Sequence, residues 1–544
     1  MNSNSRISGA RQQSSAPRGM GQADVAKFLR RGYQALMRRD FKEAGGCCNL
    51  VLKYHPELVE AHFLVGLVGI ESGDWNIARR AFKNVVSLDE GHAAGWAQLA
   101  RCCAKMGQFS LAEKAVINAE NNNPEDPLVL DVIGNVHSIL GDQEKALYWF
   151  DRAMAGGKST FFELSRAKAL TFLGRLEEAG TALKAVLAEK PDDGMAHWML
   201  SRLGKASDEN HIEAMKGITD RLPEGHPSHA FLEYAIGKEF EDLEAWDQSF
   251  EAYDAGAKAR RSQLHYDEDA EAALFNTLEK VLDEEWFGQV AEGADSTAPI
   301  FIVGQPRTGT TLVERIITAH SDVGSAGELQ QFAMAIKRLT EMASPKPMTA
   351  EIIEKAPALD MKELGSLYLE TTKSVQPDMP HFIDKMPVNY LYLPLIAAAL
   401  PNAKIIHIVR DPMDSCFASY KQLFAEAYYH SYDQEEMARH HIRYRKLMNR
   451  WRTVLGDRIL DVDYEEVVQD LEPNARRIIN FLGLDWQDAC VDFHNQDTAV
   501  TTASAAQVRE KAHTRSVGRW KKFEGHLGPM VSVLKDAGLI GEPK

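Results

Sequence analysis

The first half of the chain repeats one pattern of small and apolar positions. Small residues recur with steps of 34, 34, 34 and 33 residues, at Gly32, Gly66, Ala100, Gly134 and Ala167. A second series with nearly the same step consists of Ala44, Ala78, Ala112, Ala146 and Ala179. Because a small residue on one helix lets a partner helix pack closely, this period predicts a stack of helix pairs.

Aromatic and proline residues keep the same register. Phe82 and Phe150 would fill the space beside the small residues, and prolines would end the second helix of a pair at Pro56, Pro124 and Pro191. From about residue 24 to residue 205 the pattern resembles the tetratricopeptide repeat family. A degenerate unit follows, with matching positions at Gly237, Tyr253 and Gly256.

This resemblance implies a superhelix with a concave face. The face would be a groove for a peptide or partner protein. Alternatively, the repeats would be a stabilising scaffold or the contact surface of a homo-oligomer, and the sequence leaves these alternatives open. No catalytic set of residues lies within the repeats.

The pattern changes after an acidic helical connector. Four short apolar runs predict buried strands over residues 300–303, 381–384, 404–409 and 459–462. Helical patterns follow them over residues 310–320, about 390–400, 414–424 and 473–482. This alternation predicts a parallel sheet covered by helices on both faces. The fold class is therefore an N-terminal all-α solenoid followed by a C-terminal α/β domain of the P-loop-like type.

These changes of pattern predict four segments. We expect a disordered tail over residues 1–22, a helical solenoid over 23–261, a helical connector over 262–297 and an α/β domain over 298–544. The tail is rich in Ser, Asn, Gln, Gly and Arg and lacks the apolar core of a signal peptide. No apolar run approaches the ~18 residues that a membrane span requires.

Composition limits the partners. The net charge of −16 argues against nucleic acid or an anionic membrane as a general partner, so an anionic ligand would need a local basic pocket. The six cysteines contain no CxxC pair, which argues against zinc and redox motifs. We expect small core residues at most of these positions and, with free thiols, a reducing, cytoplasmic location.

The most specific motif follows the first predicted strand. Gly304 and Gly309 have the spacing of a nucleotide-binding phosphate loop, but Thr310 stands where such loops carry lysine, and Arg307 lies inside the turn. Free backbone N–H groups at the start of the next helix would bind a phosphate-like group. Without the lysine we expect no metal-assisted transfer of a γ-phosphate.

Polar residues also follow the other predicted strands, at Lys385, Arg410 and Tyr464. The carboxyl ends of parallel strands lie at one edge of a sheet, where ligands bind in such folds. Residues 305–311 resemble the 5′-phosphosulfate loop of sulfotransferases, and residues 405–414 resemble their 3′-phosphate segment. The spacing is most similar to protein-tyrosine sulfotransferases and to bacterial sulfotransferases fused to tetratricopeptide repeats.

The resemblance implies 3′-phosphoadenosine 5′-phosphosulfate (PAPS) as co-substrate and its 3′,5′-bisphosphate (PAP) as product. The loop would bind the 5′-phosphosulfate through Arg307, Thr308, Gly309, Thr310 and Thr311. Glu328, 21 residues after Arg307, would be the general base, provided that burial raises its pKa. Lys385, together with Arg307, would stabilise the departing phosphate oxygen.

Five further positions carry the resemblance. Arg410 would bind the 3′-phosphate, but the serine usual eight residues later is Ala418, so either the neighbouring Ser419 supplies a hydroxyl or the contact is absent. Tyr464 would lie near the adenine, Ser504 near the sulfuryl group, and Arg519 would close over the 3′-phosphate.

A segment rich in aromatic residues and histidine remains, over residues 428–432 and 440–441. It would line an acceptor pocket or, as we expect, form a helix surface. We predict no metal site there, because no carboxylate stands at ligand spacing.

The sequence thus predicts a metal-independent sulfotransferase that moves the sulfuryl group of PAPS to an acceptor hydroxyl. A protein tyrosine, with the repeats presenting peptides, and a glycan, lipid or small molecule remain alternative acceptors. A kinase or NTPase is disfavoured by Thr310. A non-catalytic interaction protein is the other alternative, which the joint presence of Glu328 and Lys385 disfavours.

Overall fold

The computed structural model describes residues 20–157, 159–342, 344, 348–424, 427–496 and 510–541. The chain divides into two compact units, one of residues 1–106 and 114–124 and the other of residues 107–113 and 125–544. Within the described part of the chain, no helix has the length and apolar character that crossing a membrane requires.

The first half consists of consecutive helices, as the period predicts. They are α1 (Gln22–Met37), α2 (Phe41–Tyr54), α3 (Val59–Glu71), α4 (Trp75–Leu88), α5 (Ala93–Lys105), α6 (Phe109–Asn121), α7 (Pro127–Ile139), α8 (Gln143–Ala155), α9 (Thr160–Phe172), α10 (Leu176–Glu189), α11 (Gly194–Ser201), α12 (Asn210–Thr219), α13 (Ser228–Asp242) and α14 (Trp246–Arg261). An aspartate caps the N-terminus of α2, α4 and α8 at the repeat spacing, at Asp40, Asp74 and Asp142.

Close contact between small and aromatic residues recurs through the helix pairs. A Cβ atom on Gly66 would lie 2.4 Å from the ring of Phe82, and one on Gly134 would lie 2.6 Å from the ring of Phe150. In the later, degenerate unit, a Cβ atom on Gly237 would lie 2.7 Å from Tyr253. Each aromatic ring therefore occupies the space that the missing side chain leaves.

Two helices, α15 (Glu268–Val281) and α16 (Glu284–Gln289), lead to the sheet. Its strands are β1 (Pro299–Gly304), β2 (Val323–Ser325), β3 (His381–Asp384), β4 (Lys404–Val409) and β5 (Ile459–Asp463). Their order is β2-β3-β1-β4-β5, and every pair is parallel. The predicted parallel sheet is confirmed, and it has one strand more than the sequence pattern indicated.

The second half of the chain also supplies the helices around the sheet. They are α17 (Thr310–Thr318), α18 (Gln331–Leu339), α19 (Ala350–Lys355), α20 (Met361–Thr372), α21 (Leu393–Ala399), α22 (Pro412–Tyr420), α23 (Gln434–Leu455), α24 (Tyr464–Gln469), α25 (Leu471–Leu482) and α26 (Gly528–Asp536). The helix predicted over 414–424 lies earlier, because Asp411 caps α22 and Pro412 begins it.

Strand β1 explains why both faces of the sheet are covered. Ile300 and Ile302 belong to the core on one face, and Phe301 and Val303 belong to the core on the other. Successive side chains of a strand point to opposite faces, so a run of apolar residues is stable only between two helical layers.

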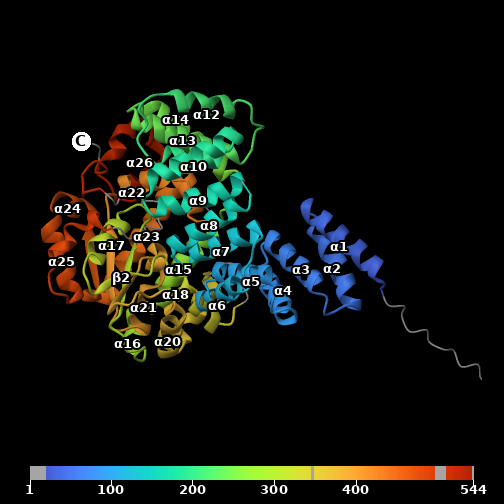
Figure 1. Ribbon diagram of the computed structural model, residues 1–544. Coiled ribbons are helices and arrows are strands. Elements are labelled where there is room, and N and C mark those ends of the chain that lie inside the picture. The colour runs from blue at the N-terminus through green and yellow to red at the C-terminus, as the bar shows by residue number, and fades with distance from the viewer. Residues whose placement is uncertain are drawn as a thin grey trace, which may run out of the picture. The chain divides into compact units, whose positions relative to one another are not determined.

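The last repeat helices share a core with the α/β part. Tyr234 and Tyr253 of α13 and α14 lie in one apolar cluster with Phe417 of α22, Met437 of α23 and Phe523. Figure 1 shows α13 and α14 beside α22 and α26. These repeat helices are therefore packed against the α/β part as one hydrophobic core.

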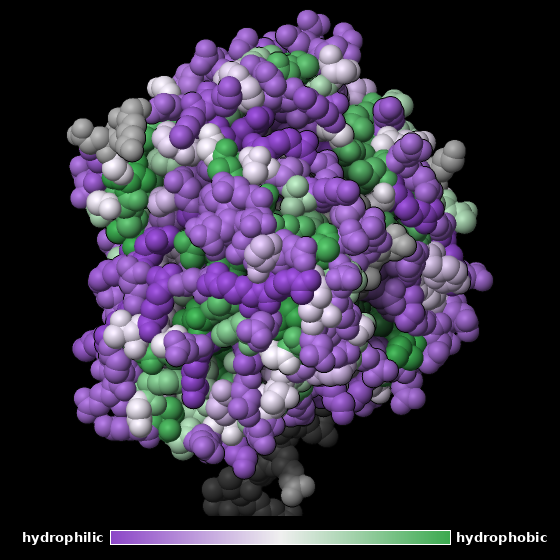
Figure 2. All heavy atoms as spheres, turned by 90° about the vertical axis from the view of Figure 1, so that its left-hand side faces the viewer, coloured by the Kyte–Doolittle hydropathy of each residue, from purple (hydrophilic) through white to green (hydrophobic). Residues whose placement is uncertain are grey.

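The molecular face on the side of α24 and α25 is mostly hydrophilic. In Figure 2 its hydrophobic side chains form small, separate groups among polar ones. Among the residues that the structure describes, this face shows no continuous apolar surface of the size that marks an extensive protein interface.

Candidate functional site

The loop after β1 has a backbone that favours glycine. Gly304 and Gly309 have φ of 153° and 103°, and Arg307 adopts a left-handed φ of 65°. A Cβ atom on Gly309 would lie 2.4 Å from the ring of Tyr464, so glycine is required there for space as well as for conformation. The Thr308 hydroxyl donates to the Gln305 carbonyl at 2.7 Å and closes the turn.

This loop leads directly into the N-terminus of α17. Gly309 is the residue before the helix, and no side chain caps the first turn. Thr310 and Thr311 are buried at this end. Backbone N–H groups and the positive end of the helix dipole therefore point toward the loop, as in an anion site.

Residues from neighbouring strands hold the loop in place. Arg410, directly after β4, donates from Nη1 to the Arg307 carbonyl and from Nη2 to the Ser516 carbonyl, each at 2.7 Å. The buried Ser419 hydroxyl donates to the Pro306 carbonyl at 3.2 Å. Tyr464 follows β5. The Arg410 guanidinium lies over its ring, 4.7 Å from the ring centre.

Positive charge accumulates around Arg307. Burial and the neighbouring cations of Arg202 and Arg410 lower the pKa of Arg307 to about 10. Burial also lowers the pKa of Lys421, and the positive charges of Arg519 and Arg307 lower it further. In a chain of net charge −16 this cluster is a local concentration of positive charge of the kind that an anionic ligand requires.

An acid–base pair lies at the ends of β2 and β3. The Lys385 ammonium, 1% exposed, donates to Glu328 Oε1. Although burial would lower it, the negative charges of Glu328 and Glu314 raise the pKa of Lys385 above its ordinary value. Glu314 is a buried residue of α17 that accepts a bond of 2.5 Å from the Ser325 hydroxyl.

Residues 299–488 match the model of the sulfotransferase family, and residues 70–135 match that of the tetratricopeptide repeat. The chain combines a sulfotransferase domain with tetratricopeptide repeats. A putative protein-tyrosine sulfotransferase of Caenorhabditis briggsae is 26% identical over 41% of this chain and 80% of its own length. The protein-tyrosine sulfotransferase of Drosophila melanogaster is 23% identical over 43% of this chain and 51% of its own.

A longer match is an uncharacterised protein of Aquifex aeolicus, 28% identical over 68% of this chain. The chain spans about half of that protein, 49% of its length. Among solved structures, the sulfotransferase domain of the curacin biosynthetic pathway aligns at 14% identity and a TM-score of 0.29, over 46% of this chain and 99% of that one. A tetratricopeptide repeat protein of Thermus thermophilus aligns with a TM-score of 0.30 at 20% identity, over 33% of this chain and 98% of that one.

The sulfotransferase domain brings most of the predicted site residues to one edge of its sheet. The loop residues 307–311, Arg410, Ser419 and Tyr464 contact one another or the same loop, and Lys385 and Glu328 form an ion pair. Arg519 begins the 3-10 helix η8 (Arg519–His526), just after Ser516 and Gly518, which contact Arg410 and Asp414. Ser504 lies outside the described residues.

The condition set for Glu328 as a general base, burial of its side chain, is not met in this structure. The side chain is 44% exposed rather than buried, because it stands in the loop between β2 and α18. The buried carboxyl groups near the pair are instead Glu314 and Asp384. Burial at this edge of the sulfotransferase domain therefore acts on the neighbours of Glu328 rather than on Glu328 itself.

Sequence reasoning missed several residues of this edge. Asp414 accepts from the backbone N–H of Gly518 at 2.5 Å and of Trp520 at 3.3 Å, which fixes the segment that carries Arg519. The Ser516 hydroxyl lies 2.6 Å from the Tyr464 hydroxyl. A signal was present for both, because Asp414 ends the motif 405–414 and Ser516 lies three residues before Arg519.

The sequence pattern predicted that the histidine-rich segment forms a helix surface, and this prediction is wrong. His430, His440 and His441 are buried, and α15 of the connector supplies Glu271, which lies beside His430 and His440. Ligand atoms of Glu271, His430 and His440 lie within 4.8 Å of one another, so a carboxylate does stand at ligand spacing.

The arrangement of this group is that of a hydrogen-bonded cluster. Arg443 and the Tyr266 hydroxyl each donate to Glu271 Oε2 at 2.8 Å. The His430 and His440 rings are stacked, with centres 3.5 Å apart and planes 10° apart. Stacked rings direct their in-plane lone pairs along parallel planes rather than at one point, and Arg443 already binds one oxygen of Glu271.

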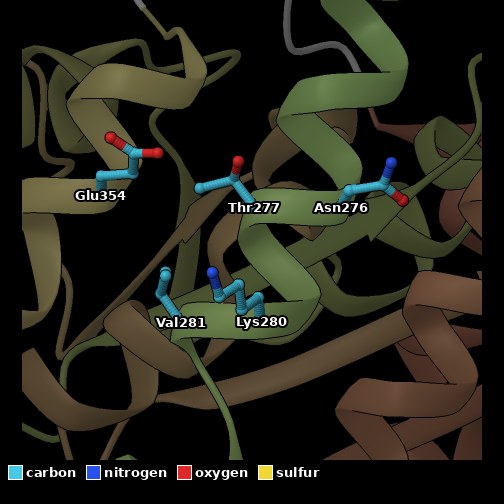
Figure 3. Close-up of a pocket in the computed structure, with 5 residues that line it drawn as sticks. All are labelled: Asn276, Thr277, Lys280, Val281 and Glu354. Carbon is cyan, nitrogen blue, oxygen red and sulfur yellow. The ribbon is translucent and has the colours of Figure 1, made fainter.

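A hollow of about 310 Å³ lies away from this edge. It is lined by Asn276, Thr277, Lys280 and Val281 of α15 and by Glu354 of α19 (Figure 3). All five of its described lining residues belong to helices, and none of them belongs to a strand. The hollow therefore does not belong to the strand-end site.

The burial of Asp384, the last residue of β3, predicts that the stability of the protein depends on pH. Burial raises its pKa from 3.8 to about 7, so the folded protein binds this proton more tightly than the unfolded chain. The resulting stabilisation is complete below about pH 4 and disappears as the pH rises through 7. Ionisation of Asp384 should lower the free energy of unfolding by up to about 4 kcal/mol between pH 4 and 7, and Asp384→Asn should remove this decrease.

Urea unfolding at several pH values measures this effect. Asp378→Asn, an exposed position before β3, is the control and should keep the pH dependence of the unsubstituted protein. Equal slopes of the free energy of unfolding against pH in both variants would show that Asp384 is already ionised.

Proposed function

We propose that this protein transfers the sulfuryl group of PAPS to an acceptor hydroxyl. The observation that carries the proposal is the convergence of an open helix N-terminus, the cations of Arg307 and Arg410, and the Lys385–Glu328 pair at one sheet edge. A nucleotide with phosphates at both its 5′ and 3′ positions needs two anion sites, and this edge offers them on adjacent strands.

Unpartnered polar atoms at the edge support the fit of such a donor. Arg410 Nε, the Ser415 hydroxyl and the Gln305 side-chain amide are buried and have no hydrogen-bond partner among the described residues. Buried polar groups are rarely left unpaired in a folded protein, so these atoms suit a ligand. Since the Ser419 hydroxyl binds the Pro306 carbonyl, we propose that Ser415 supplies the hydroxyl for the 3′-phosphate.

The proposed division of work follows from charge. The backbone of residues 307–311 and the hydroxyls of Thr310 and Thr311 bind the 5′-phosphosulfate, and Arg410 and Arg519 bind the 3′-phosphate. Glu328 accepts the proton of the acceptor hydroxyl, whose oxygen then bonds to sulfur while the bond from sulfur to the phosphate oxygen breaks. Lys385 stabilises the charge left on that phosphate oxygen. The products are a sulfate ester and PAP.

Lys385 has two anionic partners at different stages of this cycle. In the structure it binds Glu328, and the negative charges of Glu328 and Glu314 keep it protonated. We propose that it turns from Glu328 to the donor phosphate, which frees the exposed carboxylate of Glu328 for the acceptor. Glu314 then remains as the carboxylate that keeps Lys385 charged.

The acceptor is a separate proposal. The relatives from Caenorhabditis briggsae and Drosophila melanogaster carry the name protein-tyrosine sulfotransferase, which favours a tyrosine of a peptide or protein. The repeats would then bind the polypeptide. A glycan, lipid or small molecule is the alternative acceptor, and labelled PAPS incubated with cell fractions separates these classes.

Binding of the spent donor tests the proposal before any acceptor is known. We expect the purified protein to bind PAP, and to bind ATP with Mg²⁺ at least about tenfold more weakly because Thr310 replaces the lysine that such nucleotides need. Isothermal titration measures both. Tighter binding of ATP–Mg²⁺ than of PAP would favour an NTPase, and binding of neither would favour a non-catalytic repeat protein.

A further inference from the structure

The cationic edge of the sulfotransferase domain contains a carboxylate that comes from the repeats. Glu241, in the last turn of α13, accepts from Lys421 Nζ at 2.6 Å and from Arg519 Nε at 3.0 Å, both through Oε1. Its other oxygen, Oε2, accepts from the Tyr253 hydroxyl of α14 at 2.9 Å. Glu241 is 9% exposed.

The environment of Glu241 keeps it ionised. Although burial alone would raise it, the charges of Lys421 and Arg519 lower the pKa of Glu241 below its ordinary value. A buried carboxylate with three donors on two oxygens has little freedom to move. It is therefore a fixed negative point between two cations.

Arg519 is held on a second side by the repeats. Its guanidinium lies over the ring of Trp246 of α14, 4.6 Å from the ring centre. Among the described residues, Glu241 is the only hydrogen-bond partner of the Arg519 side chain, and the bond uses Nε alone. The paired Nη nitrogens, which bind a phosphate in a fork, are therefore available for a ligand.

The surrounding packing makes these contacts rigid. Tyr234 and Tyr253 of the repeat helices lie in the same apolar cluster as Phe417 and Phe523 of the sulfotransferase domain. The buried Tyr234 hydroxyl also donates to the Tyr420 carbonyl at 2.9 Å, next to Lys421. Helix α13 thus cannot shift without disturbing the core around α22 and η8.

We propose that Glu241 is a positioning residue for the donor site: from the repeat helix α13 it holds Arg519 and Lys421 where they bind the 3′-phosphate of the sulfuryl donor. This rests on the proposed function. It assigns to the last repeat helices a task in donor binding that is independent of any peptide groove.

The test compares two nucleotides on the full-length protein. PAP carries the 3′-phosphate and adenosine 5′-monophosphate lacks it. We expect Glu241→Gln to weaken PAP binding about tenfold or more and to change monophosphate binding less than about twofold. The reason is that Arg519 and Lys421 lose the charged partner that positions them. With an active acceptor, the KM for PAPS should rise while kcat stays nearly unchanged.

Asp242→Asn is the matched control. It removes the same charge one position along α13, but Asp242 pairs with Lys238 and accepts from the backbone N–H of Ala206, both within the repeat part of the chain. We expect both nucleotides to bind this variant as they bind the unsubstituted protein. An equal loss of PAP affinity in Asp242→Asn and Glu241→Gln would overturn the proposal.

A double-substitution cycle tests whether Glu241 acts through Arg519. If it does, Glu241→Gln combined with Arg519→Gln should weaken PAP binding little more than Arg519→Gln alone. Additive losses, or a Glu241→Gln protein that binds both nucleotides normally or loses both equally, would overturn the proposal. If Glu241→Gln does not fold, Tyr253→Phe, which keeps the carboxylate, should show a smaller loss confined to PAP, and no loss would overturn it.

Failure of this proposal is distinguishable from failure of the proposed function. If the unsubstituted protein does not bind PAP, the sulfuryl-donor assignment itself is wrong. If the unsubstituted protein binds PAP and discriminates it from the monophosphate, only the role of Glu241 is under test.

Discussion

Glu328→Gln is expected to lower kcat for sulfuryl transfer by about 10²- to 10⁴-fold, the usual contribution of a general base. The amide keeps the shape of the side chain and can still accept a bond from Lys385, so the KM for PAPS should change little. Because the Glu328 side chain is 44% exposed, its ion pair contributes less than about 1 kcal/mol to folding. Activity should therefore fall without loss of stability.

Steady-state kinetics and thermal unfolding together measure this result. Glu341→Gln, an exposed carboxylate after α18, is the control and should retain full activity. The acidic limb of the pH–rate profile should disappear in Glu328→Gln and persist in the control. Full kcat in Glu328→Gln would assign the base to another group.

Lys385→Met is expected to damage both activity and stability. The chemical step should slow by about 10²- to 10³-fold, because the neutral methionine leaves Arg307 alone to stabilise the charge of the departing oxygen. Folding should lose about 3–5 kcal/mol at neutral pH, since Glu314 stays buried without its neighbouring cation.

The pH dependence of this loss identifies its cause. Burial already raises the pKa of Glu314, and removal of Lys385 should raise it further. A raised carboxyl pKa contributes stability at low pH that is lost as the pH rises through the folded value. The stability difference between Lys385→Met and the unsubstituted protein should therefore grow from pH 5 to pH 8.

Glu314→Gln combined with Lys385→Met is the matched control. Without the buried carboxylate, the double variant should recover most of the lost stability but none of the activity. A single variant that is as stable as the unsubstituted protein at pH 8 would contradict the assignment of Lys385 as the counter-charge of Glu314. Urea unfolding at each pH value provides the measurement.

The sequence determined much of this protein. The 34-residue spacing of small residues predicted the stacked helices, because closely packed helix pairs require Gly or Ala at the same position of each repeat. Continuous apolar runs such as that of β4 predicted a sheet covered on both faces. Local order then placed Arg307, Lys385 and Arg410 at one edge, since parallel strands end together.

Tertiary structure decided the rest. Strand β2 has three residues, Val323–Ser325, too few for a pattern, and only pairing with β3 defines it. The burial of His430 and His440 depends on Glu271, more than 150 residues earlier, and the exposure of Glu328 depends on how its loop leaves the sheet.

Glu241 illustrates the limit most clearly. In the sequence it is one acidic residue among 78 in a repeat helix. Its contacts with Lys421 and Arg519 span 180 and 278 positions of the chain. Local patterns report what a segment buries, whereas the partners of a buried charge are set by whichever distant elements the packed core brings beside it.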